Sequence, residues 1–227
     1  MISSNVESPV ALAPSLEPGR SVAFRHGLLT FIRRKPLGVV GALIVIAFVL
    51  VAIFAGEILR QPYSQIHPSH RLEGPSSTYW LGTDDLGRDL FSRIVYGARI
   101  SLFVGFGATA ISITLGTILG VTSGYFGGVL DLLLQRLVDI WISFPALILI
   151  ISFIAVVGPG LISVIVVLGI IGASGTTRVT RGATLGIREQ TYIEGARVVG
   201  AGDLRIMLRY VLPNIFAIVL VLATVGL

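Results

Sequence analysis

Residues 192–214, YIEGARVVGAGDLRIMLRYVLPN, form a polar, arginine-bearing island between strongly apolar segments. In a membrane protein such an island lies outside the hydrocarbon, because charged side chains are costly at membrane depth, and a soluble partner can dock on it there. A solvated loop without a partner is the plainer alternative. We predict two short helices, over about residues 189–199 and 203–212, that meet at Gly200, whose lack of a Cβ atom permits a sharp turn. Asp203 is expected to cap the second helix.

The composition indicates a membrane protein. Hydrophobic residues make up 54% of the 227 residues, charged residues make up 13%, and the mean hydropathy is +0.90. An ordinary soluble domain carries about 25% charged residues, so lipid rather than water is the main solvent here. The chain has no cysteine, which excludes disulfides, thiol catalysis and cysteine-ligated metals. The net charge of +5 comes without a basic stripe interleaved with exposed aromatics, so we predict no nucleic-acid partner.

Apolar runs of about 20 residues, the length that crosses a hydrocarbon layer of ~30 Å, predict an all-α, polytopic membrane fold. The runs cover about residues 37–55, 100–121, 137–157, 161–173 and 215–227. Gly158-Pro159-Gly160 is a short turn, so the third and fourth helices are expected to form a tight hairpin. Pro145 is expected to kink the third helix or to mark its true start. The last run is too short to span, so we expect the sequence to be truncated at its carboxyl end or to be a disabled copy.

These runs divide the chain into segments. Residues 1–32 mix Ser, Pro and Glu and are expected to form a flexible cytoplasmic tail. Residues 33–56 hold the first transmembrane helix, and residues 57–97 form an extracytoplasmic loop with an interfacial helix. Residues 98–227 form a transmembrane domain, incomplete at its end, which contains the polar loop over residues 189–213.

The basic residues set the expected orientation, because cytoplasmic segments carry an excess of Lys and Arg. With the amino terminus inside, the inner segments hold twelve basic residues: Arg20, Arg25, Arg33, Arg34, Lys35, Arg136, Arg178, Arg181, Arg188, Arg197, Arg205 and Arg209. The outer loop holds four: Arg60, Arg71, Arg88 and Arg93. We therefore predict a multi-pass inner-membrane protein whose amino terminus and polar loop are cytoplasmic.

Two features lie within the apolar runs. Small residues recur every four positions on one face of the second run: Ala108, Ser112, Gly116, Gly120 and Gly124. Small residues let helix backbones approach closely in lipid, so we predict a helix-packing face, either within this chain or against a partner. In the third run Asp139 follows Arg136 by three residues, a spacing that allows an ion pair. The alternative is that Asp139 lines a conduit.

The outer segment WLGTDDLGRDLFSRIVYGARISL, residues 80–102, is typical of an amphipathic helix at the membrane interface that runs into the second span. Thr83, Asp84 and Asp85 are expected to cap its amino end. Calcium binding by these aspartates does not fit the spacing of an EF-hand loop, and we predict no metal site.

Four motifs occur in one order: LGTDDLGRDLFSR at residues 81–93, GARISL at 97–102, GYFGGVLDLLLQRLVDIWISFP at 124–145, and the polar loop that closes in LPN at 212–214. Together they resemble the C-type permease of the dipeptide, oligopeptide and nickel importers, a family of ATP-binding-cassette (ABC) transporters. The resemblance runs from Arg33 to Leu227. In the first motif it rests on Gly82, Thr83, Asp84, Gly87, Arg88 and Asp89.

The resemblance implies an all-helical type I importer permease, normally with six spanning helices. As partners it implies a second, B-type permease subunit, two cytoplasmic ATP-binding subunits and an extracytoplasmic substrate-binding protein. The polar loop resembles the family's ATPase-coupling loop, and the matching positions are Glu194, Gly195, Ala196, Gly200, Leu212 and Pro213. Glu194, Ala196 and Gly200 would contact the ATPase, and Leu212-Pro213 would join the loop to the fifth helix. The family usually has alanine where Gly195 stands.

The resemblance further implies a transport subunit, not an enzyme, that imports di- or oligopeptides with ATP and magnesium bound by partner subunits and no cofactor in this chain. The chain itself lacks the GxxxxGK[ST] loop, since its only lysine, Lys35, follows Arg34. Nickel, glutathione or another small solute remains open as substrate. An autonomous secondary transporter or channel also remains open, whereas a membrane-embedded enzyme would need paired carboxylates, a metal cluster or a nucleophile–base pair.

Overall fold

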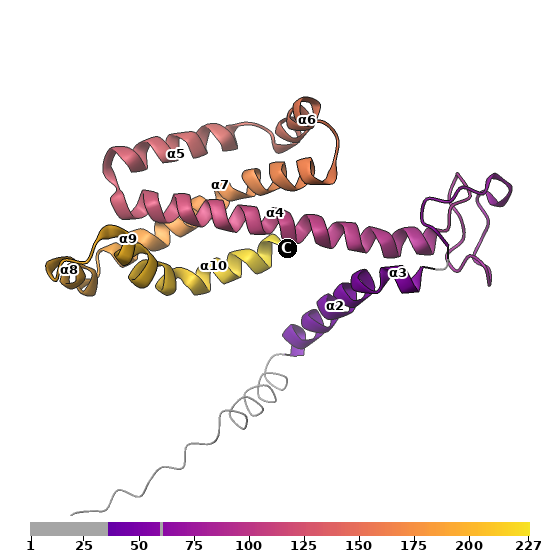
Figure 1. The fold of residues 1–227 in the computed structure, drawn as a ribbon, viewed down its shortest axis with the longest axis horizontal. Coiled ribbons are helices and arrows are strands. Elements are labelled where there is room, and N and C mark those ends of the chain that lie inside the picture. Colours follow the sequence, from indigo (N-terminus) through magenta and orange to yellow (C-terminus); the bar gives the residue numbers. More distant parts are fainter. Residues whose placement is uncertain (1–35, 60) are drawn as a thin grey trace, which may run out of the picture. The chain divides into compact units, whose positions relative to one another are not determined.

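The computed structural model describes residues 36–59 and 61–227, and the regular elements within them are helical (Figure 1). In chain order they are α2 (Pro36–Ile53), α3 (Ala55–Ile58), a 3-10 turn (Pro68–His70), α4 (Leu90–Phe126), α5 (Gly128–Ser143), α6 (Ala146–Val157), α7 (Leu161–Arg188), α8 (Thr191–Val198), α9 (Asp203–Ile206), a π-helical turn (Met207–Val211) and α10 (Leu212–Gly226). Of these described residues, those up to Leu50 form one unit, and those from Val51 to Leu227 form a second. The predicted tail over residues 1–32, together with Arg33, Arg34, Lys35 and Arg60, lies outside the described residues.

Within the described residues, four helical stretches are long and apolar enough to cross a membrane: Pro36–Ile53, Leu90–Phe126, Leu161–Arg188 and Asp203–Gly226. α5 and α6 would make a fifth, broken span, since they are bent by 92° where they meet. Pro145 lies at this break, directly before α6, and it has no N–H with which to continue α5. The predicted all-helical, polytopic fold is confirmed, and Pro145 marks the start of a separate helix.

α4 is longer than the second apolar run predicted. It continues without a break for 37 residues from Leu90 to Phe126, which is about 55 Å at 1.5 Å per residue. Its cap is Asp89, whose carboxylate accepts hydrogen bonds from the backbone N–H of Ser92 at 3.1 Å and from its hydroxyl at 2.6 Å. The predicted cap by Thr83, Asp84 and Asp85 is wrong, because those residues lie in the loop before Asp89 and not at the helix end.

α4 packs side by side with α7, and this contact is the centre of the second unit (Figure 1). Cβ atoms added to the α4 glycines would lie 2.4 Å from α7 (Gly116 to Thr176 Cβ), 2.6 Å (Gly120 to Thr177 O) and 2.8 Å (Gly124 to Thr184 Cβ). Hydroxyls join the same faces, since Ser112 Oγ lies 3.3 Å from Thr176 Oγ1. The small-residue face thus packs against a helix of this chain, at a separation that only glycine allows.

Candidate functional site

The polar island folds as an elbow, by which we mean α8, the turn at Gly200 and α9. Gly200 has a φ of +82°, a left-handed conformation that favours glycine. The turn closes α8 with a Schellman motif: the N–H of Ala201 donates to the carbonyl of Ala196 at 3.0 Å, and the N–H of Gly200 donates to that of Arg197 at 2.9 Å. The first predicted short helix and the turn at Gly200 are therefore present, whereas the second predicted helix does not end near residue 212 but continues into α10.

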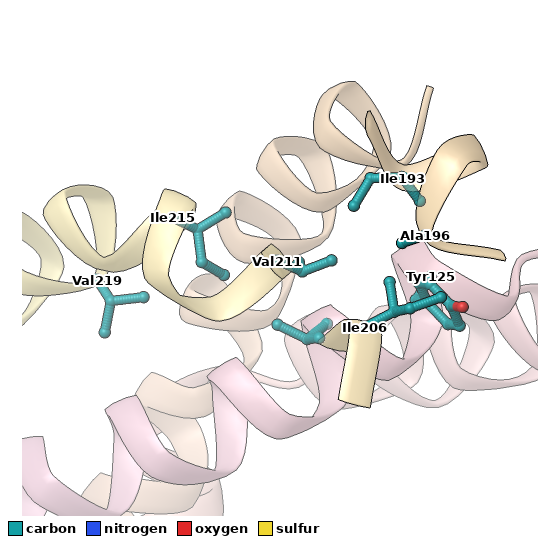
Figure 2. Close-up of a cluster of buried hydrophobic side chains, with 8 residues drawn as sticks. Tyr125, Ile193, Ala196, Ile206, Val211, Ile215 and Val219 are labelled. Atoms are coloured by element: carbon teal, nitrogen blue, oxygen red, sulfur yellow. The ribbon is translucent and has the colours of Figure 1, made fainter. Parts of the chain in front are cut away.

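One face of the elbow is buried against the helix bundle. Ile193 of α8 and Ile206 of α9 are fully buried, and Ala196, three residues after Ile193, is 6% exposed. Figure 2 shows these side chains beside residues of α4 and α10. The buried cluster consists of Val121, Tyr125, Ile193, Ala196, Ile206, Val211, Ile215 and Val219. Burial of one Ile side chain contributes about 1.5–3 kcal/mol, so the elbow is held firmly to the helices behind it.

Tyr125, in the last turn of α4, adds polar contacts to this anchor. Its hydroxyl donates a hydrogen bond to Asp203 at 2.7 Å, and the guanidinium carbon of Arg197 lies 5.3 Å from its ring centroid, within range of a cation–π contact. Asp203 therefore binds Tyr125 instead of capping α9, and the residue at the cap position is Gly202. Sequence reasoning missed Tyr125, although it lies inside the quoted GYFGG motif.

The opposite face of the elbow is exposed and carries apolar side chains beside charged ones. Val198 and Val199 are 86% and 83% exposed, and Glu194 and Gly195 lie on the exposed side of α8. A Cβ atom at Gly195 would meet nothing within 4 Å. Of the three residues expected to contact a partner, Glu194 and Gly200 are thus exposed, whereas Ala196 is part of the buried anchor.

Leu212 and Pro213 do not form a separate joint. The helix runs from Asp203 to Gly226 as one stretch of 24 residues, with the π-helical turn Met207–Val211 directly before Leu212. Pro213 has no N–H to donate to the preceding turn, and the side-chain amide of Asn214 donates to the carbonyl of Tyr210 at 2.6 Å. The elbow is therefore continuous with α10, so a movement of α9 reaches the membrane helix directly.

The outer-loop motif forms a compact, internally bonded turn before α4. Asp84 accepts hydrogen bonds from the backbone N–H groups of Leu86 at 2.9 Å and Arg88 at 3.0 Å, from Arg88 Nε at 2.8 Å, and from Arg93. Burial raises the pKa of Asp84, but the hydrogen bonds from Arg88, Leu86 and Arg93 outweigh it and hold this pKa well below its ordinary value. Asp84 is therefore a charged hub that orders the loop.

Two glycines of the motif are required by close backbone approach. Gly82 and Gly87 have φ angles of +78° and +74°, and added Cβ atoms would lie 2.4 Å from the carbonyl oxygen of Glu73 and 1.8 Å from that of His67. Thr83 joins the motif to the earlier part of the loop. Its hydroxyl accepts a hydrogen bond from the N–H of Glu73 at 2.9 Å and donates one to the carbonyl of His70. The six motif residues are thus gathered into one folded turn.

Two ion pairs join α5 to α7. Arg181 binds the Asp131 carboxylate through Nε and Nη2, each at 2.6 Å. Arg178 Nη2 lies 2.6 Å from Asp139 Oδ1. The predicted pairing of Asp139 with Arg136 is therefore wrong, because a cation from the neighbouring helix reaches the carboxylate. A sequence spacing of three reveals only partners on the same helix.

The described helices and the elbow define a multi-span, all-helical membrane protein with a polar appendage anchored to its bundle. Residues 112–227 match the family of inner membrane components of binding-protein-dependent transport systems, and residues 29–75 match the N-terminal transmembrane domain of oligopeptide transport permease C. The chain belongs to the family of binding-protein-dependent transport system inner membrane components. It is thus a multi-pass inner-membrane component of this family, and the family resemblance drawn from the sequence is confirmed.

Three curated relatives illustrate the similarity, one named for dipeptide transport and two for glutathione transport. A dipeptide transport system permease protein of Alkalihalophilus pseudofirmus is 40% identical over 195 residues, which cover 86% of this chain and 64% of the relative. Glutathione transport system permease proteins of Pectobacterium atrosepticum and Escherichia coli are each 38% identical, covering 80% and 93% of this chain and 60% and 70% of the relatives. The chain thus spans 60% to 64% of the length of the first two relatives.

Proposed function

We propose that this chain is one permease subunit of an ATP-driven importer of short peptides, with the elbow as the docking point of a cytoplasmic ATPase. The amino terminus and the elbow lie in the cytoplasm, and the Asp84 loop lies outside. A second permease subunit, two ATP-binding subunits that hold ATP and magnesium, and an extracytoplasmic binding protein complete the transporter.

The observation that carries this proposal is the two-sided elbow. Its outer face exposes the adjacent Val198 and Val199 almost fully, and a contiguous exposed apolar patch rimmed by polar residues is typical of a contact with a protein or a membrane. Its inner face places Ile193 and Ile206, both fully buried, in the cluster with α4 and α10. A force on the outer face is therefore passed to membrane helices through packed side chains and a continuous α9–α10 backbone.

The substrate class is supported by the relatives. The names of the two kinds of relative specify dipeptide and glutathione transport, and both solutes are short, water-soluble peptides with charged termini. We therefore assign short peptides, including glutathione-like ones, to this transporter.

Co-purification tests the docking role. Glu194→Lys and Val199→Glu change exposed side chains only, so the helix bundle keeps its packing, and we expect both variants to lose the ATPase from the purified complex. Glu57→Lys, a matched charge reversal on the exposed face of α3, should retain it. Full ATPase recovery with Glu194→Lys and Val199→Glu would contradict the proposal.

Sidedness is a separate test, made simple by the absence of cysteine from the chain. In a Val198→Cys variant made without the ATPase subunits, which would otherwise cover this position, an impermeant thiol reagent should label inside-out vesicles and leave spheroplasts unlabelled. Labelling of spheroplasts would place the elbow on the extracytoplasmic side of the membrane, where a cytoplasmic ATPase cannot bind it, and would contradict the proposal.

A further inference from the structure

A row of polar side chains runs along α5 from its first turn to its last residue. Asp131, Gln135, Asp139 and Ser143 follow one another every four residues, and the positions between them are apolar except for Arg136. Residues four apart lie on one side of a helix, so these side chains form a single inclined row on an otherwise lipophilic helix.

The lower part of this row is satisfied within the chain. Asp131 is held by Arg181 and by the hydroxyl of Ser123, and Gln135 donates to Ser123 Oγ at 3.0 Å. Asp131 and Arg181 are only 15% and 31% exposed. This lower cluster therefore acts as a structural clamp that joins α4, α5 and α7.

The upper part is open. Asp139 and Arg178 are paired at 2.6 Å, yet their side chains are 47% and 49% exposed. Asp139 lies eight residues beyond the clamp residue Asp131, which is about 12 Å along α5. Arg178 lies seventeen residues after the start of α7 at Leu161, about 26 Å along that helix. If α7 enters a hydrocarbon layer of ~30 Å at Leu161, the exposed pair lies just within the inner edge of that layer, which agrees with the place of Arg178 among the inner basic residues.

Lipid cannot cover this pair, because charged groups in hydrocarbon are costly and face a protein or a water-filled path instead. A second feature favours the path. The helix breaks one turn above Asp139, where α5 ends at Ser143 and α6 starts at Ala146 with a bend of 92°. Non-helical backbone at membrane depth is tolerated where it is buried in protein or lines a water-filled cavity. An open charge pair and an interrupted backbone thus lie together.

We propose that Asp139 and Arg178 line the translocation path and bind the charged termini of a passing peptide. The ammonium group of a zwitterionic peptide would replace Arg178 at the Asp139 carboxylate, and its carboxylate would replace Asp139 at the Arg178 guanidinium. Each charge thereby exchanges one partner for another and is never left alone in a medium of low dielectric constant. This inference rests on the proposed function, since it names the site at which the same transporter contacts its substrate.

The test uses single-cysteine variants in the assembled, detergent-solubilised complex, where both sides are accessible. We expect the introduced thiol of Asp139→Cys to react with a water-soluble thiol reagent about ten-fold faster than that of Ile140→Cys. The Ile140 side chain is itself 57% exposed but does not belong to the polar row. Millimolar alanyl-alanine should slow the Asp139→Cys reaction several-fold. The same dipeptide with an acetylated amino end and an amidated carboxyl end should leave it unchanged.

Transport gives the second readout. Asp139→Asn and Arg178→Gln should each lower alanyl-alanine uptake about ten-fold, because each variant replaces a charge-assisted hydrogen bond to the peptide only partly. Asp139→Glu, which keeps the charge, should retain most uptake. All of these variants should co-purify with the ATPase.

A thiol at position 139 that is inert, or that reacts alike with and without alanyl-alanine, would overturn the inference and show that a protein surface covers the pair. Wild-type uptake by Asp139→Asn and Arg178→Gln would overturn it as well. Neither result touches the proposed function, which instead fails if the unaltered complex binds no ATPase through its elbow.

Discussion

Substitution of Gly120 by alanine tests whether the α4–α7 contact sets the geometry of the bundle. The added Cβ atom would lie 1.9 Å from Thr180 Oγ1 and 2.6 Å from the carbonyl oxygen of Thr177. Ordinary contact begins near 3.4 Å, so the Thr177 backbone would have to move by about 0.8 Å, the difference between 3.4 and 2.6 Å. The hydroxyl of Thr180 is held in place, because the backbone carbonyl oxygens that can accept its hydrogen bond are those of Gly116 at 3.1 Å and Thr176 at 2.8 Å. Rotation of the side chain away from the added methyl group would break this hydrogen bond.

The expected energy follows from two opposing effects. Overpacking of a rigid interior costs about 1–3 kcal/mol, and contact with backbone atoms places Gly120→Ala at the upper end. The better helix propensity of alanine offsets up to about 1 kcal/mol. The net destabilisation is about 2–3 kcal/mol, which corresponds to a melting temperature lower by about 4–12 °C for a chain of this size.

The assay is thermal denaturation of the purified complex, with Gly175→Ala as control. Gly175 lies on α7, and a Cβ atom there would meet nothing within 4 Å, so the same chemical change carries the propensity gain without the clash. We expect Gly175→Ala to melt at or slightly above the wild-type temperature. Equal melting temperatures for the two variants would refute the close-contact reasoning.

The other predictions concern the elbow, the clamp and the outer loop. Gly200→Ala should cost about 1–2 kcal/mol through its left-handed backbone alone, since a Cβ atom there meets nothing within 4 Å; it should weaken ATPase co-purification, whereas Gly202→Ala, at a φ of −69°, should not. Gly195→Ala should stabilise α8 by up to about 1 kcal/mol, and the variant complex should retain the ATPase. Loss of the ATPase from this variant would show that the partner approaches the α8 backbone at Gly195. Asp131→Asn should destabilise the complex by about 1–3 kcal/mol, because Arg181 loses its charged partner in a site where it is 31% exposed; an unchanged melting temperature would deny the clamp. Since folding lowers the pKa of Asp84 from its ordinary 3.8, the outer loop should hold its full stability above about pH 4 and lose it progressively as the pH falls further; Asp84→Asn should mimic this loss at pH 7, seen as faster proteolysis of the loop.

The spans and the elbow could be predicted from sequence because their signals are local. Apolar length reports a membrane helix directly, and a glycine between two short polar helices reports a left-handed turn. The small residues from Ser112 to Gly124 likewise predicted a close helix contact, although their period alone could not say whether α7 or another subunit lies opposite.

Apart from the Asp89 cap of α4, the contacts that sequence reasoning missed join residues far apart in the chain. Arg178 reaches Asp139 across 39 positions, and Tyr125 reaches Asp203 across 78, so neither pair leaves a trace at helical spacing. Ala196 was expected to contact a partner because of its place in the motif. A motif position does not reveal which face of its helix is buried, so the burial of Ala196 could not be predicted in this way. Only the packing of Ile193 and Ile206 against α4 and α10 decides that Ala196 points inward.

The bundle contains one interface suited to staying fixed and one suited to moving. α4 and α7 meet at glycine–threonine contacts closer than a methyl group would permit, and interlocked packing of this kind resists sliding because any shift breaks many contacts at once. Beyond its apolar contacts, α5 is joined to α7 by two ion pairs, of which the Asp139–Arg178 pair is about half exposed. An ion pair can exchange partners without disruption of a packed core. The elbow lies at the carboxyl end of α7 and is continuous with α10. In the proposed function, a push from a docked ATPase would therefore move α10 and the interlocked α4–α7 pair relative to α5, and the Asp139–Arg178 pair is the contact at which a charged substrate would change the response of α5.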